Sequence, residues 1–288
     1  MSELTATDIY HFREGTFFRA YDKLGAHLMS VDGVEGTRFA VWAPNADAVL
    51  VMGDFNGWNH DSHPMTVRAD QSGIWEVFIP EVGKGSVYKY FVRSRYADYA
   101  VEKSDPYAIL CEEPPRTGAV VWDNGYEWND IEWQRDCARV NALDAPWSIY
   151  EVHLGSWRRV AADGNRSLNY REVAHELADY VVDLGFTHVE LMPVMEHPFF
   201  GSWGYQITGY FAPSSRYGTP QDLMYLIEHL HKMGVGVILD WVPSHFPSDQ
   251  HGLAFFDGTH LYEHADPRQG FPSGVEQLDF QLWSRRGA

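Results

Sequence analysis

The hydrophobic rhythm of the chain changes at about residue 146, and this change limits the folds that the chain can adopt. Before that point, short apolar runs rich in β-branched and aromatic residues are separated by turn residues, a pattern typical of an all-β sandwich. The Asn56-Gly57 pair is a strong turn signal between two of these runs. The predicted strands lie at 39–43, 48–52, 74–79 and 87–92.

After residue 146, strand-like and helical segments alternate. Continuous apolar strands that alternate with helices indicate parallel βαβ units. Thr219 is a plausible N-cap, and Pro220 fits the first position of the helix that follows it. The sequence therefore predicts a multidomain β plus α/β fold, with a domain boundary near Ala145-Pro146. The predicted strands are 148–154, 187–192 and 235–239, and the predicted helices are 170–184 and 220–233.

The composition narrows the classes of partner. The chain has 288 residues and is 45% hydrophobic and 22% charged, which is ordinary for a packed globular protein. Its formal net charge of -18 argues against nucleic acid and anionic membranes, since both select for clustered Lys and Arg. No apolar run approaches the roughly 20 residues that span a bilayer. The 11 Trp, 16 Tyr and 16 Phe suit a sugar ligand as well as core packing.

Two further features of the sequence indicate the cellular compartment of the protein. Cys111 and Cys137 are too few for a disulfide framework in a chain of this length, which favours a reducing compartment. Residues 1–12 lack the apolar stretch of a secretory signal. We therefore expect a cytoplasmic protein, and the oligomeric state stays open.

Two of the predicted strands end in segments rich in polar and aromatic residues. In parallel α/β folds, functional side chains collect at the carboxyl ends of the strands. The strand at 187–192 is followed by PVMEHP at 193–198 and GSWGYQ at 201–206. The strand at 235–239 is followed directly by DWVPSHF at 240–246. These two strand ends are the candidate functional region.

Together with YFAP at 210–213 and RYGTP at 216–220, these motifs resemble the α-amylase-type family, and specifically the 1,4-α-glucan (glycogen) branching enzymes. The resemblance extends from about residue 12 to residue 270. VWAP at 41–44 and GDFNGW at 53–58 resemble the carbohydrate-binding module of that family. YEVHLGSW at 150–157 is similar to its first barrel strand. A different amylase-type enzyme, debranching or trehalose-releasing, is disfavoured by the WVP that follows Asp240.

The resemblance implies an architecture in parts. An immunoglobulin-like β-sandwich, the carbohydrate-binding module, would occupy residues 1–125, and 126–145 would be a linker. Residues 146–270 would form the first part of a (β/α)8 TIM barrel, with about three strands. Since a closed barrel takes roughly 200 residues or more, we expect a partial barrel of low stability with unpaired apolar strand edges.

The resemblance also implies substrate-binding residues. His245 would hydrogen-bond a glucose hydroxyl, Tyr205 would stack beneath the same sugar, and Asp240 would hold the hydrogen-bond network in place. Trp203 and Gln206 belong to the same motif as Tyr205. Each has a structural alternative: an Asp after a strand can cap a turn, a His beside a Phe is commonly buried and satisfied, and a Tyr can be core. The order and spacing of the motifs favour the functional interpretation.

A metal site is the competing interpretation of the histidines. His260 and His264 have the i, i+4 spacing of a ligand pair, but no third ligand stands at a recognised spacing. We therefore predict no metal and no cofactor. The residues considered were His245, Asp249, His251, Asp257, His260 and His264.

The chemistry of the family raises a further expectation. Retaining glycosyl transfer needs two carboxyl groups about 5 Å apart. In the family that the chain resembles, the nucleophile Asp and the acid/base Glu come from the fourth and fifth barrel strands, whereas Asp240 follows the third. We expect family descent from enzymes that cut α-1,4-glucan and make α-1,6 branches in glycogen biosynthesis, with no catalysis by this chain alone. The alternative is a non-catalytic protein that binds glucan, including glycogen, through the sandwich.

The last residues carry their own hypothesis. After Gly270 the family typically continues with HPEWSSSIFNYGR. One extra base placed before plausible codons for that segment yields PSGVEQLDFQLWS, which is the sequence of residues 272–284. We therefore expect 271–288 to be an out-of-frame tail, and a natural in-frame tail is the alternative.

Overall fold

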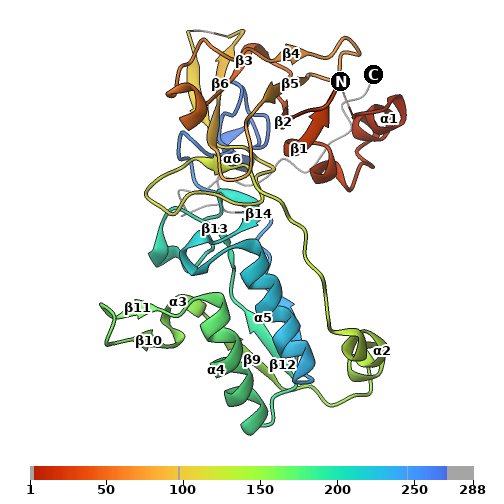
Figure 1. Ribbon diagram of the computed structural model, residues 1–288, viewed down its shortest axis with the longest axis vertical. Coiled ribbons are helices and arrows are strands. Elements are labelled where there is room, and N and C mark those ends of the chain that lie inside the picture. Colours follow the sequence, from red (N-terminus) through yellow and green to blue (C-terminus); the bar gives the residue numbers. More distant parts are fainter. Residues whose placement is uncertain (1–2, 97, 245, 271–288) are drawn as a thin grey trace.

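The computed structural model describes residues 3–96, 98–244 and 246–270. Figure 1 shows a β-rich part at one end of the long axis and a parallel α/β part at the other, with the strands β13 (Met195–Glu196) and β14 (Gly209–Pro213) between them. The hypothesis on residues 271–288 concerns a segment outside the described residues.

The β-rich part consists of two antiparallel sheets, which confirms the predicted sandwich. The four strands predicted from the apolar runs are β2, β3, β5 and β6, and each is longer than its run by one to four residues. One sheet has the order β1-β2-β5-β4, and the other has the order β3-β6-β7, with β8 also paired to β6. The bounds are β1 Gly25–Val31, β2 Val34–Trp42, β3 Ala46–Gly53, β4 Thr66–Val67, β5 Ile74–Pro80, β6 Val87–Ser94, β7 Ala100–Lys103 and β8 Ala119–Val120.

Alternation along the strands builds the sandwich core. Phe39 and Val41 of β2 face Tyr88 and Tyr90 of β6, and all four side chains are fully buried. The predicted turn at Asn56-Gly57 is confirmed, since Gly57 ends a short 3-10 turn, η2 (Asp54–Asn56), with a φ of 62° that suits glycine. Two elements precede the first strand: α1 (Ala6–Glu14) and η1 (Ala20–Asp22).

Between the two parts, residues 126–145 contain the helix α2 (Ile131–Val140). Trp133 of α2 stacks on His231 of the helix α5 (Pro220–Lys232), with ring centroids 4.8 Å apart and an angle of 11° between the ring planes. The Nδ1 atom of His231 also lies 2.7 Å from a carboxylate oxygen of Asp130, the residue before the helix. This segment is therefore held against the surface of α5 (Pro220–Lys232).

The α/β part is a three-stranded parallel sheet with the order β15-β12-β9, which confirms the predicted βαβ units. The strands are β9 Ile149–Val152, β12 His188–Leu191 and β15 Gly236–Leu239. The helices α4 (Tyr170–Asp183) and α5 pack on one face, where they bury Val189 and Leu191. Thr219 caps α5, with Pro220 at its first position, as predicted. In the described segments, β9 and β15 each have one unpaired edge.

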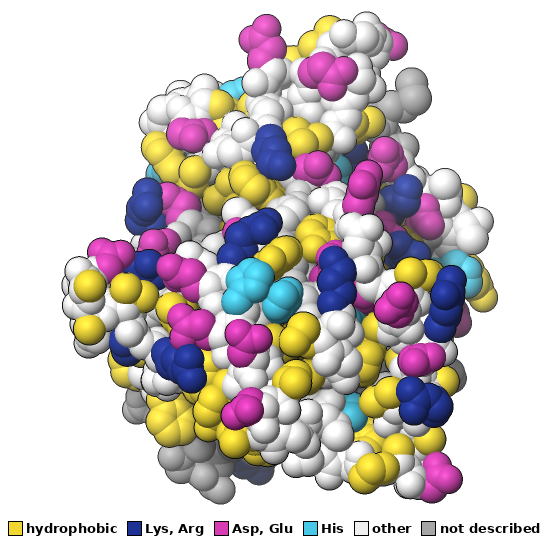
Figure 2. All heavy atoms as spheres, turned by 60° about the horizontal axis from the view of Figure 1, so that its bottom comes forward, with side chains coloured by type: hydrophobic (Ala, Val, Ile, Leu, Met, Phe, Trp, Pro, Cys, Tyr) yellow, Lys and Arg dark blue, Asp and Glu magenta, His cyan; other side chains and the backbone are white. Residues whose placement is uncertain are grey.

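Shorter elements occupy the segments that follow β9, β12 and β15 along the chain. They are α3 Leu154–Trp157, β10 Arg159–Val160, β11 Arg166–Ser167, β13 Met195–Glu196, η3 Phe200–Ser202, β14 Gly209–Pro213, η4 Ser215–Tyr217 and α6 Pro267–Gly270. Figure 2 views the molecule from the end that carries α4 and α5, and Lys, Arg, Asp and Glu side chains are interspersed over that face. None of the described helices is long and apolar enough to span a membrane.

The segment that follows β15 returns to the sandwich, where Figure 1 shows it among the strands of that part. Phe256 is fully buried in the sandwich core. The Nζ atom of Lys103, also fully buried, donates to the carbonyl oxygens of Gly252 and Ala254 at 3.1 and 2.7 Å. The backbone N–H of Asn45 donates to a carboxylate oxygen of Asp257 at 2.9 Å. Residues that follow β15 in the chain thus complete the core of the sandwich.

Candidate functional site

The candidate site lies at the carboxyl ends of β12 and β15. Asp240 is the first residue after β15, and its backbone N–H donates to the carbonyl of Leu191 at the end of β12, at 3.0 Å. The sheet itself therefore fixes the backbone of Asp240.

Tyr205 reaches the same point from the loop that follows β12. Its hydroxyl donates a hydrogen bond of 2.6 Å to Oδ2 of Asp240. The path of the loop depends on Gly204, which has a φ of 88°. A Cβ atom at Gly204 would lie 2.2 Å from the carbonyl oxygen of Pro193, so a larger residue would displace the loop that delivers Tyr205. The structure thus brings together two of the residues that the sequence singled out.

The electrostatics of the Tyr205–Asp240 pair determine which of the two side chains carries the proton of the hydrogen bond. The hydrogen bond to Asp240 raises the pKa of Tyr205 to about 12, and burial and the nearby carboxylates of Glu151 and Glu190 add to the shift. At neutral pH the phenol is therefore a donor and the carboxylate of Asp240 is the acceptor. A carboxylate can accept about four hydrogen bonds, so the Tyr205 bond leaves Asp240 with capacity for a ligand.

The remaining predicted residues differ in their placement. Trp203 has a φ of 55°, and its side chain is 57% exposed. Gln206 is half-buried. His245 lies outside the described residues.

His153, at the end of β9, supports two exposed rings beside the site. Its Nδ1 atom lies 2.8 Å from Oγ of Ser156, which fixes the imidazole. The ring of Phe200 meets it edge-on at 5.8 Å between centroids, and the ring of Trp203 lies at 6.3 Å. Burial lowers the pKa of His153, so the imidazole is neutral at neutral pH.

A buried ion pair holds the loop that carries Tyr205. The side chain of Glu196 is 95% buried and accepts hydrogen bonds from the backbone N–H of Ser215 at 2.8 Å and from Nη1 of Arg216 at 2.9 Å. Burial raises the pKa of Glu196, while these donors oppose that shift. Sequence reasoning did not select this residue, although a Glu directly after the apolar run at 191–195 was a usable signal.

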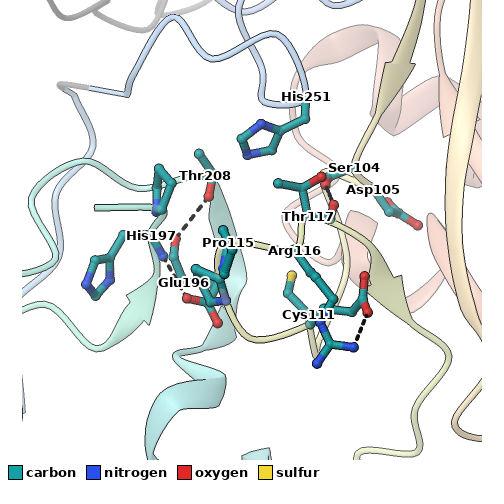
Figure 3. Close-up of a pocket in the computed structure, with 13 residues that line it drawn as sticks. Ser104, Asp105, Cys111, Pro115, Arg116, Thr117, Glu196, His197, Thr208 and His251 are labelled. Atoms are coloured by element: carbon teal, nitrogen blue, oxygen red, sulfur yellow. Dashed lines mark hydrogen bonds and ion pairs between the residues drawn. The ribbon is translucent and has the colours of Figure 1, made fainter. Parts of the chain in front are cut away.

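A small cavity of about 40 Å³ lies behind this ion pair, where the sandwich, the β13–β14 hairpin and the returning segment meet. Figure 3 shows Ser104 and Thr117 on one side of it, Glu196 and Thr208 on the other, and His251 above. Its lining does not include Tyr205 or Asp240, so the cavity belongs to the junction and not to the candidate site. Over the described part of the chain, no three His, Cys, Asp or Glu side chains are grouped so that they could hold a metal ion.

Comparison with family models matches two separate parts of the chain. Residues 23–108 match carbohydrate-binding module 48, described as the isoamylase N-terminal domain. Residues 169–271 match the alpha amylase catalytic domain. The sandwich and the parallel sheet thus correspond to two known domain families.

Curated relatives match over most of the chain. It is 62% identical over 262 residues to the 1,4-alpha-glucan branching enzyme GlgB of Aquifex aeolicus, which covers 91% of this chain and 41% of the relative. It is 61% identical over 270 residues to the same-named protein of Aromatoleum aromaticum, which covers 94% of this chain and 41% of the relative. The chain therefore spans about two fifths of the length of these relatives.

A solved structure shares the fold. The crystal structure of a Salmonella typhimurium protein proposed to be an alpha amylase superposes with a TM-score of 0.64, at 22% sequence identity. The match covers 88% of this chain and 38% of that one. At this identity the match establishes the arrangement of the sandwich and the sheet.

Proposed function

We propose, from the premise that this chain belongs to the 1,4-alpha-glucan branching enzyme family, that it binds an α-1,4-glucan at the carboxyl end of the β15-β12-β9 sheet. The observation that supports this most directly is the hydrogen bond between Tyr205 and Asp240, which draws the loop after β12 onto the end of β15. Glycogen is the natural polymer of this class.

The pair has the chemistry of a sugar subsite. The Tyr205 ring offers an apolar face for a glucose ring, and the free acceptor positions of Asp240 suit sugar hydroxyl donors. In the proposed complex, His245 supplies a further hydrogen bond to the same glucose, with Trp203 and Gln206 near its edge. This subsite needs no metal or cofactor.

The proposed reaction of the family is cleavage of an α-1,4 bond and transfer of the glucan to a 6-hydroxyl. Transfer with retention proceeds through a covalent glycosyl-enzyme and needs a nucleophile and an acid/base about 5 Å apart. We assign Asp240 to substrate positioning because its carboxylate already accepts from Tyr205. The two catalytic carboxyls would come from further barrel strands, and we expect the 288 residues alone to bind glucan without branching it.

Calorimetric titration with maltoheptaose tests the binding site. We expect Tyr205→Ala and Asp240→Asn to weaken binding about tenfold or more, a loss of about 1.4 kcal/mol per tenfold. The matched control is Tyr10→Ala, which removes a ring that is 61% exposed on α1, away from the sheet. Equal binding by all four proteins would contradict the assignment. An iodine-stain assay on amylose tests catalysis, and a spectral shift with the purified chain would overturn the expected inactivity.

A second candidate function is glucan binding by the sandwich alone. It is favoured by the complete core of that domain and by Trp58, which follows the Gly57 turn with a φ of 61° and is 38% exposed. Affinity electrophoresis in a glycogen gel separates the two functions. Retardation that survives Tyr205→Ala and is lost in Trp58→Ala would favour the sandwich.

The cytoplasmic location stays a prediction. It accords with Cys111 and Cys137, which are both free thiols in the structure. Fractionation of the source cells would test it.

A further inference from the structure

An open groove of about 680 Å³ lies beside the candidate site, outside the residues that the family resemblance singled out. Three parts of the fold meet there: the β10–β11 hairpin with the start of α4, the loop that carries η3 and η4, and the end of the sandwich. The groove is lined by Glu113, Arg166, Ser167, Asn169, Phe200, Arg216 and Tyr217.

Phe200 forms a fixed, partly open ring in this groove. A Cβ atom at Gly155 would lie 2.8 Å from the ring, so the ring packs directly on the backbone of α3. Its edge-on contact with His153 holds it from the other side. The side chain is nevertheless 40% exposed. A ring held in one orientation with an accessible surface is suited to stack a sugar at low entropic cost.

Phe200 also connects the groove to the site of Tyr205 and Asp240. The same imidazole of His153 contacts Trp203, whose exposed ring lies two residues before Tyr205 in the chain. The exposed rings of Phe200 and Trp203 are therefore neighbours of one fixed side chain. Together they form an aromatic surface that begins in the groove and includes the chain segment that leads to Tyr205.

The two arginines of the groove are each held by carboxylates. Arg166 donates from both terminal nitrogens to the carboxylate of Glu172, at 2.8 Å each, and its Nε donates to Asp163 at 2.6 Å. Arg216 is held by Glu196. Because these guanidinium groups are paired and Glu113 faces the same groove, the groove offers planar hydrogen-bonding groups without a net positive field. That combination suits a neutral polyhydroxyl ligand better than an anion.

We propose that this groove is an extended subsite, which binds further glucose units of the glucan chain whose other end lies at Tyr205 and Asp240. The chain passes over Trp203 and Phe200, and its hydroxyls bond to the polar groups around Arg166. This inference rests on the proposed function and deepens it, because it sets the length of glucan that the protein recognises. Short oligosaccharides reach only the first subsite, whereas long ones occupy both.

The test compares maltotriose with maltoheptaose by calorimetric titration of the full chain. We expect Phe200→Ala to weaken maltoheptaose binding about fivefold to tenfold and to leave maltotriose binding unchanged. The matched control is the adjacent Phe199→Ala, which removes a ring that is 62% exposed and packs on Gly201 outside the groove. This control should bind both ligands as the parent does. Hydrogen exchange of the parent should show protection of residues 200–202 and 166–167 by maltoheptaose alone.

Every other outcome contradicts either the extended subsite or the proposed function. Equal losses in Phe199→Ala and Phe200→Ala, or a loss for both ligands in Phe200→Ala, would overturn the extended subsite. If Tyr205→Ala abolishes binding while Phe200→Ala has no effect, the groove inference fails and the proposed function stands. If the parent chain binds neither ligand, the proposed function fails, and the inference fails with it.

Discussion

The hydroxyl of Tyr205 and Oδ2 of Asp240 lie 2.6 Å apart, although the two residues stand on different loops at the end of the sheet. The bond stabilises the protonated phenol, because a phenolate would face the carboxylate directly. The geometry of the site is therefore coupled to the ionisation of one side chain, which can be measured without any ligand.

We predict that Asp240→Asn lowers the pKa of Tyr205 from about 12 toward its ordinary value of 10. The carboxylate is the largest cause of the shift, and an amide removes its charge while it keeps an oxygen that can accept. Carbon NMR of tyrosine labelled at Cζ measures the titration, and Tyr205→Phe identifies the signal. An unchanged titration of that signal in Asp240→Asn would contradict the observed pairing.

We predict that Phe256→Ala destabilises the sandwich, although Phe256 follows the third barrel strand. The side chain is fully buried in the sandwich core, and the loss of a buried Phe typically costs about 3–5 kcal/mol. Urea unfolding followed by tryptophan fluorescence measures the loss. Phe255→Ala is the matched control because Phe255 is 38% exposed, and its loss should cost about 1 kcal/mol or less. Equal losses in the two variants would argue against the burial of Phe256.

Lys103 predicts an unusual dependence of stability on pH. Burial lowers its pKa from 10.5 to about 8, against the opposing influence of the Glu263 and Asp257 carboxylates. Between these two values the unfolded chain binds more protons than the folded one, so this group's contribution to the unfolding free energy rises with pH. The penalty for burying the charge is fully present below pH 8 and is relieved as the pH approaches 10.5.

The measurement is the difference in unfolding free energy between the parent and Lys103→Met, taken at several pH values. We expect this difference to shift in favour of the parent by at most about 3 kcal/mol from pH 8 to pH 10.5. Subtraction of the variant removes the contribution of tyrosines that titrate in the same range. A difference that is flat across this window would show that Lys103 keeps an ordinary pKa.

Removal of Glu196 should damage the loop that carries Tyr205. Glu196→Ala leaves Arg216 buried without its carboxylate, and a broken buried ion pair typically costs about 3–5 kcal/mol. The control is Asp136→Ala, which breaks an exposed pair with Arg139 and should cost less than about 1 kcal/mol. Thermal unfolding measures both. Similar small losses would mean that the pair contributes little to the loop.

Local signals in the sequence predicted much of the fold. Thr219-Pro220 marked the start of α5 because capping chemistry is local, and alternating apolar residues marked β2, β3, β5 and β6. The helix α2 was not predicted, because the partner of Trp133 is His231 on a distant helix. The return of residues 246–264 to the sandwich was not predicted either. The apolar residues around Phe256 follow no strand or helix periodicity in the sequence, so no local pattern indicated that it packs in the sandwich core.

The same distinction between local signals and long-range contacts applies to the candidate site. The motifs around Tyr205 and Asp240 identified both residues, and the structure added the bond between them. Glu196 and the groove around Phe200 depend on contacts between loops that no local pattern encodes. Side chains that act through long-range packing were missed, whereas those within a recognisable motif were found.

The burial of Phe256 has a consequence for the time course of biosynthesis. The last sandwich strand, β8, ends at Val120, which is 136 residues before Phe256. At a synthesis rate of about 5–20 residues per second, the ribosome needs roughly 7 to 27 s to cover that interval. Throughout this period the sandwich lacks one of the apolar side chains of its core, because Phe256 has not yet been synthesised. Its native packing therefore waits for the synthesis of Phe256, although its strands are made before those of the parallel sheet.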